Sequence, residues 1–173
     1  MNYKINDILG KFKEQRVAVI GDVFLDCFSY GNAIRMSPEA PVPIIDIEKE
    51  IYSPGGAANT AVNIAALGGV PKIYGLVGND NNHKELKKLL EQKRVKYNLY
   101  LLLPETIVKT RYLGDNGNGN YQQFLRTDKG DKAAFEINFQ DRKEIINHLV
   151  INLKEFNPEV IVISDYAKGF LDN

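Results

Sequence analysis

The chain has 173 residues, of which 44% are hydrophobic, and its 22 basic and 22 acidic residues balance to a formal net charge of zero. This length and composition fit one globular domain or a large part of one. Without net charge there is no general attraction to nucleic acid or to an acidic membrane surface, so local residues have to hold any charged ligand.

The other bulk features point to a cytoplasmic protein. Cys27 is the single cysteine and cannot form an internal disulfide, and no window approaches the roughly 20 apolar residues of a membrane span. Residues 1–15 are predicted to form an amphipathic helix rather than a signal peptide. The apolar side chains on one face of this helix are Ile5, Ile8, Leu9 and Phe12.

Strands and helices are predicted to alternate along the first half of the chain. A short β-branched run at 17–20 precedes Gly21-Asp22, which is typical of a buried parallel strand ending in a turn. Two peripheral strands follow at 24–30 and 42–47, and the prolines between them exclude a helix. Further predicted elements are a helix after the glycine-rich stretch 53–69, a strand at 71–78 and a helix capped by Asp80. This order predicts a parallel sheet with crossover helices.

The second half continues the same pattern with a predicted hairpin inserted. Three strand-like runs are KYNLYLLL, TIVKTRYLG and NYQQFLRTD, and the last two are joined by the turn 114–120. A helix over 139–156 leads to a buried strand at 160–163. A doubly wound sheet normally continues beyond this point, so we expect the chain to be the first half of a larger fold. We therefore expect an apolar sheet edge at 160–163, and a chain that dimerises, swaps elements or aggregates.

The stretch SPGGAANTAVNIAALGG is shaped for close contact with a ligand. Gly55 and Gly56 let the backbone approach a ligand just before a predicted buried helix, yet no lysine follows them as in a P-loop. Asn59 and Asn63 lie four residues apart on one face, and buried amides need partners that both donate and accept, as sugar hydroxyls do. The alternative is that the glycines only permit a tight turn and that the asparagines bond to backbone. This stretch alone does not decide between the two.

Three separated stretches carry a family resemblance. They are VAVIGDVFLDCFSYG, RMSPEAPVPIIDIE leading into SPGGAANTAVNIAALGG, and VISDYAKG near the end. Together they resemble the N-terminal half of the PfkB/ribokinase family of carbohydrate kinases. Within it they are similar to the branch that phosphorylates heptose 7-phosphate on the route to ADP-heptose and lipopolysaccharide core. The resemblance implies a ribokinase-like α/β fold over 1–173, a parallel sheet with flanking helices and a small β lid at about 23–31 and 42–48.

The resemblance also implies roles for particular residues. Asp26 matches the aspartate that accepts hydrogen bonds from sugar hydroxyls, and Gly55, Gly56 and Asn59 match the loop that wraps the sugar. The lid strands are expected to cover the sugar and to pair across a homodimer. The substrate implied is a small sugar phosphate, with neither nucleic acid nor membrane as a partner.

Cationic residues are the expected ligands of the substrate phosphate. Lys109 and Arg111 alternate on one strand and so share a face, and they fall where this branch has a K-x-R pair. Arg35, in the lid connection, is a weaker candidate for the same role. Asp165 and Lys168 are expected beside the zone of phosphoryl transfer.

Each of these residues also has a plain structural interpretation. Asp22 and Asp26 could be turn or cap residues, Lys109 and Arg111 could be the solvated face of an edge strand, and Lys168 could be a surface lysine. The two histidines, His83 and His148, are interpreted as structural. No spacing of His, Cys and carboxylates suggests a metal site.

The catalytic motif of the family is expected elsewhere. The family's G-x-G-D motif provides the anion-stabilising amides and the base, with ATP and Mg²⁺ held by adjacent segments, and no stretch of these 173 residues matches it. We therefore expect no catalytic residue in this chain, no strong binding of ATP or Mg²⁺, and no activity of the chain alone. Two alternatives stay open: a kinase of the same fold for another sugar or nucleoside, and a non-catalytic sugar-binding or dimerisation module.

Overall fold

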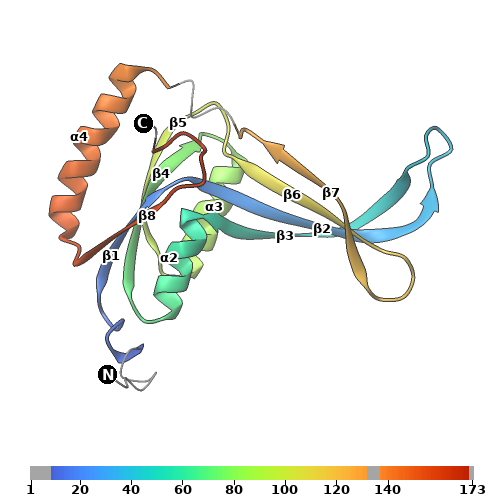
Figure 1. The fold of residues 1–173 in the computed structure, drawn as a ribbon, viewed down its shortest axis with the longest axis horizontal. Helices are drawn as coiled ribbons and strands as arrows, with labels where there is room; N and C mark the ends of the chain where they lie inside the picture. The colour runs from blue at the N-terminus through green and yellow to red at the C-terminus, as the bar shows by residue number, and fades with distance from the viewer. Residues whose placement is uncertain (1–8, 132–136, 172–173) are drawn as a thin grey trace.

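The computed structural model describes residues 9–131 and 137–171, which form two sheets and the helices around one of them (Figure 1). The parallel sheet has the order β5-β4-β1-β8 and consists of β1 (Arg16–Gly21), β4 (Val70–Gly78), β5 (Lys96–Leu103) and β8 (Val160–Ser164). The second sheet, called the lid below, has the order β3-β2-β6-β7 and consists of β2 (Val23–Met36), β3 (Pro43–Gly56), β6 (Val108–Asp115) and β7 (Tyr121–Lys129). The helices are α2 (Ala57–Ala66), α3 (Asn81–Gln92) and α4 (Phe139–Phe156).

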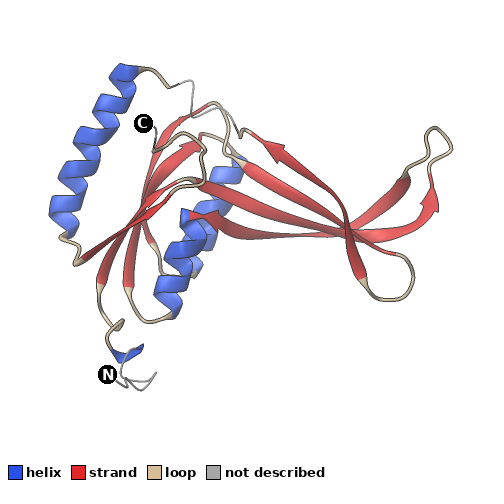
Figure 2. Cartoon of the chain, viewed as in Figure 1, coloured by secondary structure: helices blue, strands red, loops and turns tan. Residues whose placement is uncertain are grey.

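The helices cover both faces of the parallel sheet, and the lid extends away from them as bare strands (Figure 2). Alternate residues of β1 divide the core between the two faces, because successive side chains of a strand point in opposite directions. Val17 and Val19 pack in the cluster that contains the buried residues of α2 and α3, whereas Ala18 and Ile20 pack against α4. The buried run at 17–20 is therefore a central parallel strand, as the sequence predicted.

The helix starts follow from local hydrogen bonds. Asp80 accepts a bond from the backbone N–H of His83 at 2.9 Å, which confirms the predicted cap of α3. Asn138 caps α4 in the same way through Asp141. None of the helices in the described part of the chain combines the length and apolar character needed to cross a membrane.

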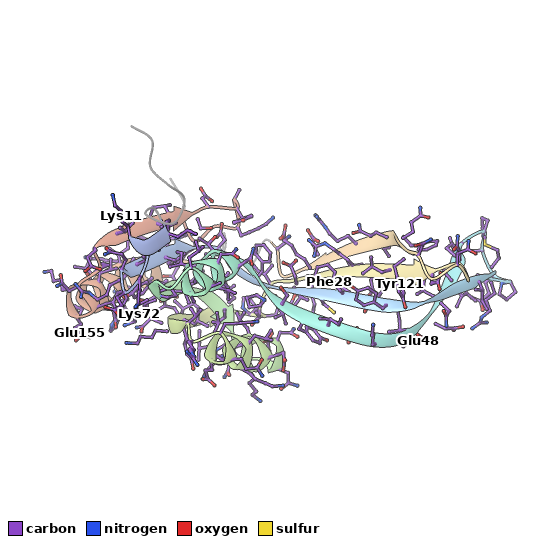
Figure 3. The ribbon with its side chains drawn as sticks, turned by 90° about the horizontal axis from the view of Figure 1, so that it is seen from below. Lys11, Phe28, Glu48, Lys72, Tyr121 and Glu155 are labelled. Atoms are coloured by element: carbon purple, nitrogen blue, oxygen red, sulfur yellow. The ribbon has the colours of Figure 1, made fainter. Side chains whose placement is uncertain are left out.

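The lid is larger than the sequence predicted. Its first two strands run over Val23–Met36 and Pro43–Gly56 rather than about 23–31 and 42–48, and the predicted hairpin of β6 and β7 completes the sheet. The prediction failed because it followed apolar alternation, whereas the ladder between β2 and β3 continues through polar and glycine residues with register shifts. Figure 3, turned by 90°, shows how far the lid reaches beyond the helices.

The predicted N-terminal helix is present only in part. Residues 9 and 10 are helical, but residues 11–14 form a turn, so the helix does not continue to residue 15. Leu9 and Phe12 are 43% and 38% exposed, and the side chains therefore do not form the buried stripe expected of an amphipathic helix. Ile5 and Ile8, also assigned to that stripe, lie outside the described residues.

Strand β8 forms an exposed apolar edge of the parallel sheet. It pairs with β1 and is the last strand in the order of the sheet. Ile161 and Ile163, which lie on the side of α4, are 53% and 59% exposed, whereas Val162 packs partly against the core on the other side. An open strand of this kind favours pairing with another chain.

We expect substitution of this edge by charge to reduce self-association. Ile161→Lys together with Ile163→Lys places two ammonium groups on the exposed edge and should shift the sedimentation profile towards smaller species without loss of stability. Val162→Lys is the matched control, because it buries a charge and should lower the stability of the fold instead. A wild-type chain that sediments as a monomer at all concentrations contradicts the expectation.

Candidate functional site

The site lies where β1 and β8 end, α2 begins and the lid departs, and Asp22 is at this junction. Asp22 is 2% exposed, and its backbone N–H donates to the carbonyl of Ser164 at 3.1 Å. Its carbonyl accepts from the N–H of Ala57, the first residue of α2, at 2.9 Å. Its carboxylate accepts the backbone N–H groups of Tyr166 at 2.8 Å, Lys168 at 3.1 Å and Phe170 at 3.1 Å. One buried residue thus fixes the start of α2 and the loop after β8.

Gly55 and Gly56, the two glycines just before α2, are required by this junction. Gly56 has φ of 59° and ψ of −131°, a conformation that is essentially restricted to glycine. A Cβ atom at Gly56 would lie 2.4 Å from the carbonyl oxygen of Asp22, and one at Gly55 would lie 2.3 Å from the ring of Phe24. The glycines therefore permit close packing of backbone and ring where the strand turns into α2.

The prediction that Asn59 and Asn63 are buried is wrong. Both are exposed, and the buried residues of α2 are Ala57, Ala58 and Ala61. The sequence did not predict which face of α2 is buried, because alanines lie on several sides of this helix and alanine is compatible with either a buried or an exposed position. Asn59 lies in the first turn, close to the junction, whereas Asn63 lies one turn further from it.

The polar face of the lid begins next to the junction. The ladder of β2 and β6 places Asp26 opposite Lys109 and Phe28 opposite Arg111, so all four side chains share one face. Nη1 of Arg111 lies 2.6 Å from Oδ1 of Asp26, and the guanidinium stands 5.2 Å from the centroid of the Phe28 ring. Because β6 is an interior strand of the lid, the edge-strand interpretation of this pair is excluded.

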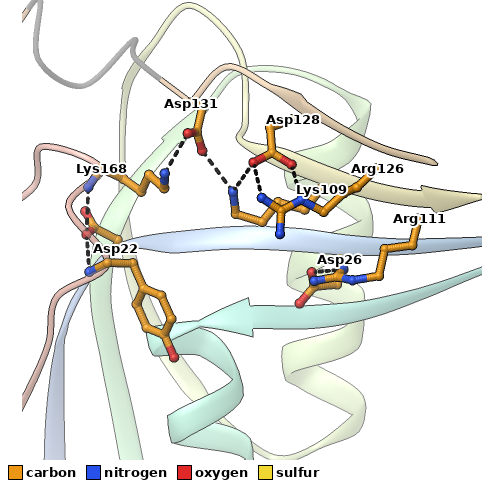
Figure 4. A network of polar contacts seen from close by, with 9 residues as sticks. Asp22, Asp26, Lys109, Arg111, Arg126, Asp128, Asp131 and Lys168 are labelled. Atoms are coloured by element: carbon orange, nitrogen blue, oxygen red, sulfur yellow. Dashed lines mark hydrogen bonds and ion pairs between the residues drawn. The ribbon is translucent and has the colours of Figure 1, made fainter. Parts of the chain in front are cut away.

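A network of ion pairs continues from Lys109 towards the parallel sheet (Figure 4). The ammonium of Lys109 lies 2.9 Å from Oδ2 of Asp128 and 2.9 Å from Oδ1 of Asp131. The other oxygen of Asp131 lies 2.6 Å from the ammonium of Lys168, and Arg126 also pairs with Asp128. The structure thus brings Lys109 and Lys168, predicted separately, to one carboxylate. Lys168 is half-buried rather than an ordinary surface lysine.

The sequence analysis missed Asp128 and Asp131. Asp128 faces Lys109 directly across the ladder of β6 and β7, so the register of the predicted hairpin was a usable signal for it. Asp131 follows the end of β7, and no pattern in the sequence relates it to Lys168, which is 37 residues away.

The pKa values in this network shift towards the charged forms. Burial lowers the pKa of Lys109, but its hydrogen bonds to Asp128 and Asp131 outweigh burial and raise that pKa overall. Burial raises the pKa of Asp131, yet the bonds from Lys168 and Lys109 lower it below the ordinary aspartate value. The bond from Lys109 likewise lowers the pKa of Asp128. All three groups are therefore ionised near neutral pH.

Two predicted residues lie apart from this network. Arg35 is near the far end of β2, where its guanidinium lies 2.9 Å from Asp46 and both side chains are more than half exposed. Asp165 is exposed, and its carboxylate accepts the N–H of Ala167 at 2.8 Å, as a turn residue does. Within residues 9–131 and 137–171, no group of three or more His, Cys, Asp and Glu side chains is arranged to hold a metal ion.

Comparison with known families identifies the class of protein. Residues 14–157 match the model of the pfkB family of carbohydrate kinases, and the chain therefore belongs to this family. The bifunctional protein HldE of Coxiella burnetii (strain RSA 331 / Henzerling II) is 37% identical over 165 residues, and HldE of Vibrio vulnificus (strain YJ016) is 40% identical over 172 residues. The alignments cover 94% and 96% of this chain but 32% and 33% of those proteins. The chain thus spans about a third of the length of these relatives.

Solved structures with the same fold agree with this class. Phosphofructokinase-2 from Escherichia coli in complex with fructose-6-phosphate has a TM-score of 0.58 and 17% identity, over 88% of this chain and 45% of that chain. A carbohydrate kinase from Agrobacterium tumefaciens has a TM-score of 0.55 and 15% identity, over 84% of this chain and 52% of that chain. The fold is the ribokinase-like α/β fold that the sequence predicted.

We expect Gly56→Ala to lower the free energy of unfolding more than the same substitution at a glycine with positive φ elsewhere in the chain. The new Cβ meets the carbonyl of Asp22, and the backbone conformation excludes alanine, so the free energy of unfolding should fall by about 3 kcal/mol. The matched control is Gly119→Ala, which has φ of 74° and open space around it and should cost about 1 kcal/mol. Urea unfolding measures both values, and equal losses would contradict the close approach at Gly56.

Acid should weaken the ion pairs of Asp131. Because the pKa of this carboxyl is lower in the folded chain than in the unfolded chain, its contribution is present above the ordinary value of 3.8 and is lost as the pH falls through the lowered folded value. Asp131→Asn should therefore be less stable than wild type at pH 7, with a difference that shrinks below pH 3.8. Urea unfolding of both proteins, from pH 7 to below pH 3.8, measures how the difference in the free energy of unfolding changes with pH. The control Asp46→Asn removes an exposed pair and should change little.

Proposed function

We propose that this chain carries the sugar-binding part of a kinase that phosphorylates heptose 7-phosphate at the anomeric O1, giving the 1,7-bisphosphate with ATP as the donor. The observation that carries this proposal is the pair of cations, Lys109 and Arg111, on the lid face that also holds Asp26. Lys109 pairs with Asp128 and Asp131, and Arg111 pairs with Asp26. A sugar phosphate supplies a further anion that these cations can bind, whereas a neutral sugar does not. The resemblance of the sequence to the heptose-phosphate branch supports the particular sugar.

In this proposal the residues of the junction act on the sugar. Asp26, whose Oδ1 lies 2.6 Å from Nη1 of Arg111, accepts hydrogen bonds from sugar hydroxyls. Gly55, which has no Cβ, lets the Phe24 ring and the Asp26 carboxylate pack directly against the backbone, and this packing places the carboxylate that binds the sugar. Asn59, in the first turn of α2, is available to bond a further hydroxyl. Positioning of this kind is the main contribution of protein residues to phosphoryl transfer.

ATP and Mg²⁺ are expected from the family resemblance. The described residues form no cluster of carboxylates or histidines suited to a metal ion, and no stretch of the sequence matches the G-x-G-D motif. We propose that these 173 residues bind the sugar phosphate without transferring phosphate to it, and that they act in the cytoplasm.

We further propose that the chain forms a homodimer through the lid. The lid face opposite Lys109 has an apolar hollow of about 500 Å³. Its lining residues are Val42, Pro43, Ile45, Tyr112, Phe124, Leu125 and Thr127. We expect a dimer of this kind to persist in the variant with lysine at 161 and 163 and to dissociate in Leu125→Glu. Sedimentation of the two variants therefore distinguishes association through the lid from association through the edge of β8.

Two other functions compete with the first. In a kinase of the same fold for an unphosphorylated sugar or nucleoside, Lys109 and Arg111 would serve only their ion pairs with carboxylates of the chain. A non-catalytic sugar-binding module would share the site but not the reaction.

We expect the chain to bind heptose 7-phosphate at least tenfold more tightly than the unphosphorylated heptose, because one charge-assisted interaction is worth about 1.5–3 kcal/mol. Calorimetry with wild type and Lys109→Gln measures this difference, and Lys129→Gln, at an exposed lysine, is the control. Equal affinities for the two sugars would refute the phosphate assignment. In the same samples with ATP and Mg²⁺ we expect no bisphosphate, and its formation would refute the proposed inactivity.

A further inference from the structure

Two lysines from different sheets meet at one carboxylate. Lys109 comes from β6 of the lid, and Lys168 comes from the loop after β8 of the parallel sheet. Each ammonium binds a different oxygen of Asp131, at 2.9 Å and 2.6 Å. A single acidic group therefore bridges the lid and the α/β unit, which is the parallel sheet with its helices, at the junction (Figure 4).

We propose that Lys109 and Lys168 form a phosphate-binding subsite, and that in the free chain the carboxylate of Asp131 occupies this subsite as an internal counter-ion. An incoming phosphate group takes the place of Asp131 between the two ammonium groups. This inference rests on the proposed function, because a phosphorylated ligand has to reach the junction.

The side chain of Lys109 and the backbone of Lys168 are held in place independently of Asp131. The side chain of Lys109 is 8% exposed, and its ammonium lies 5.2 Å from the centroid of the Phe24 ring and 2.9 Å from Asp128. The backbone of Lys168 is fixed by its N–H bond to the carboxylate of Asp22, which also accepts two neighbouring N–H groups. Removal of Asp131 from the pair would therefore leave the fixed ammonium of Lys109 and a second ammonium, carried by a fixed backbone, facing one gap.

Asp131, in contrast, is placed to withdraw. Its side chain is 28% exposed, more than either lysine, and it follows Gly130, which has φ of 73°. Glycine changes its backbone conformation at low cost, so rotation at Gly130 can carry the carboxylate out of the subsite.

The charges favour a phosphate over the carboxylate. Once Asp131 leaves, Asp128 is the remaining carboxylate beside Lys109, and it is shared with Arg126. Two cations then share one carboxylate and Lys168 has lost its ion pair, so the subsite carries excess positive charge. A phosphate dianion supplies more negative charge and more acceptor oxygens than a carboxylate, and lysine binds phosphate well as a point charge. Such an exchange makes binding selective, because a neutral ligand cannot displace Asp131.

Arg111 then has a different role from Lys109. Its guanidinium is engaged with Asp26 at 2.6 Å, on the side of the lid strand where the sugar hydroxyls are expected. The subsite thus combines Lys109 with Lys168 rather than with its neighbour in the K-x-R pattern, and Arg111 is a positioning residue for Asp26.

The test is calorimetric titration of the 173-residue chain with inorganic phosphate at constant ionic strength. Asp131→Asn keeps the shape of the side chain and removes the competing charge, so its affinity for phosphate should rise about tenfold. Lys168→Gln should abolish this gain when it is combined with Asp131→Asn. Asp46→Asn changes the net charge equally at an exposed pair remote from the subsite and should match wild type.

An affinity of Asp131→Asn equal to or below that of wild type, with cooperative thermal unfolding retained, overturns the proposal and makes Asp131 a permanent structural link. If this variant does not unfold cooperatively, lysine side-chain NMR of wild type replaces it. Phosphate must then shift the Nζ signals of Lys109 and Lys168 together and leave that of Lys129 unchanged, and any other pattern overturns the subsite.

Two further titrations identify the source of the phosphate. Displacement of inorganic phosphate by a sugar phosphate, with ATP ineffective, assigns the subsite to the substrate. The reverse result assigns it to the nucleotide, and failure of both to displace phosphate overturns the subsite as part of this active centre. A sugar phosphate that binds no better than its sugar, while Asp131→Asn still gains phosphate affinity, refutes the proposed substrate and leaves the subsite standing.

Discussion

The burial of the Asp22 carboxylate is the constraint on which the site depends. A buried charge is tolerated only when it is fully hydrogen-bonded, and here three backbone N–H groups of one loop provide the bonds. The same residue also bonds through its backbone to β8 and to the first residue of α2. Three segments that are distant in the sequence are thereby held at fixed positions: the end of β1, the start of α2 and the loop after β8.

The lid is joined to this junction without a linker. β2 starts two residues after β1 ends, and its first residues, Val23 and Leu25, belong to the core of the α/β unit. The strand then leaves the core while its ladder with β6 continues, so the alternation that buries Val23 also determines the direction of Asp26. Asp26, Lys109 and Arg111 are therefore held at the base of the lid, near the strand ends of the parallel sheet, where ligands of open α/β folds bind.

Sequence and structure agree where one local pattern is sufficient. The apolar run at 17–20, the cap at Asp80 and the hairpin around 114–120 follow from burial, helix capping and turn chemistry, and all three are confirmed. The pattern failed for Asn59 and Asn63, because an alanine-rich helix does not reveal which of its faces is covered. It also failed for the length of the lid, because backbone pairing continues where side-chain alternation has ended.

The sequence by itself determined the family and the parallel sheet, since these depend on short motifs and on strand periodicity. It also indicated Asp26, Lys109, Arg111 and Lys168 as candidate site residues. Only the tertiary structure decided how the charges are partnered. Arg111 binds Asp26, Lys109 and Lys168 share Asp131, and Asp22 holds the loop that carries Lys168. These pairs join residues up to 146 positions apart. Their formation depends on where separate strands end in space, and that placement is set by packing of the whole core rather than by any local pattern.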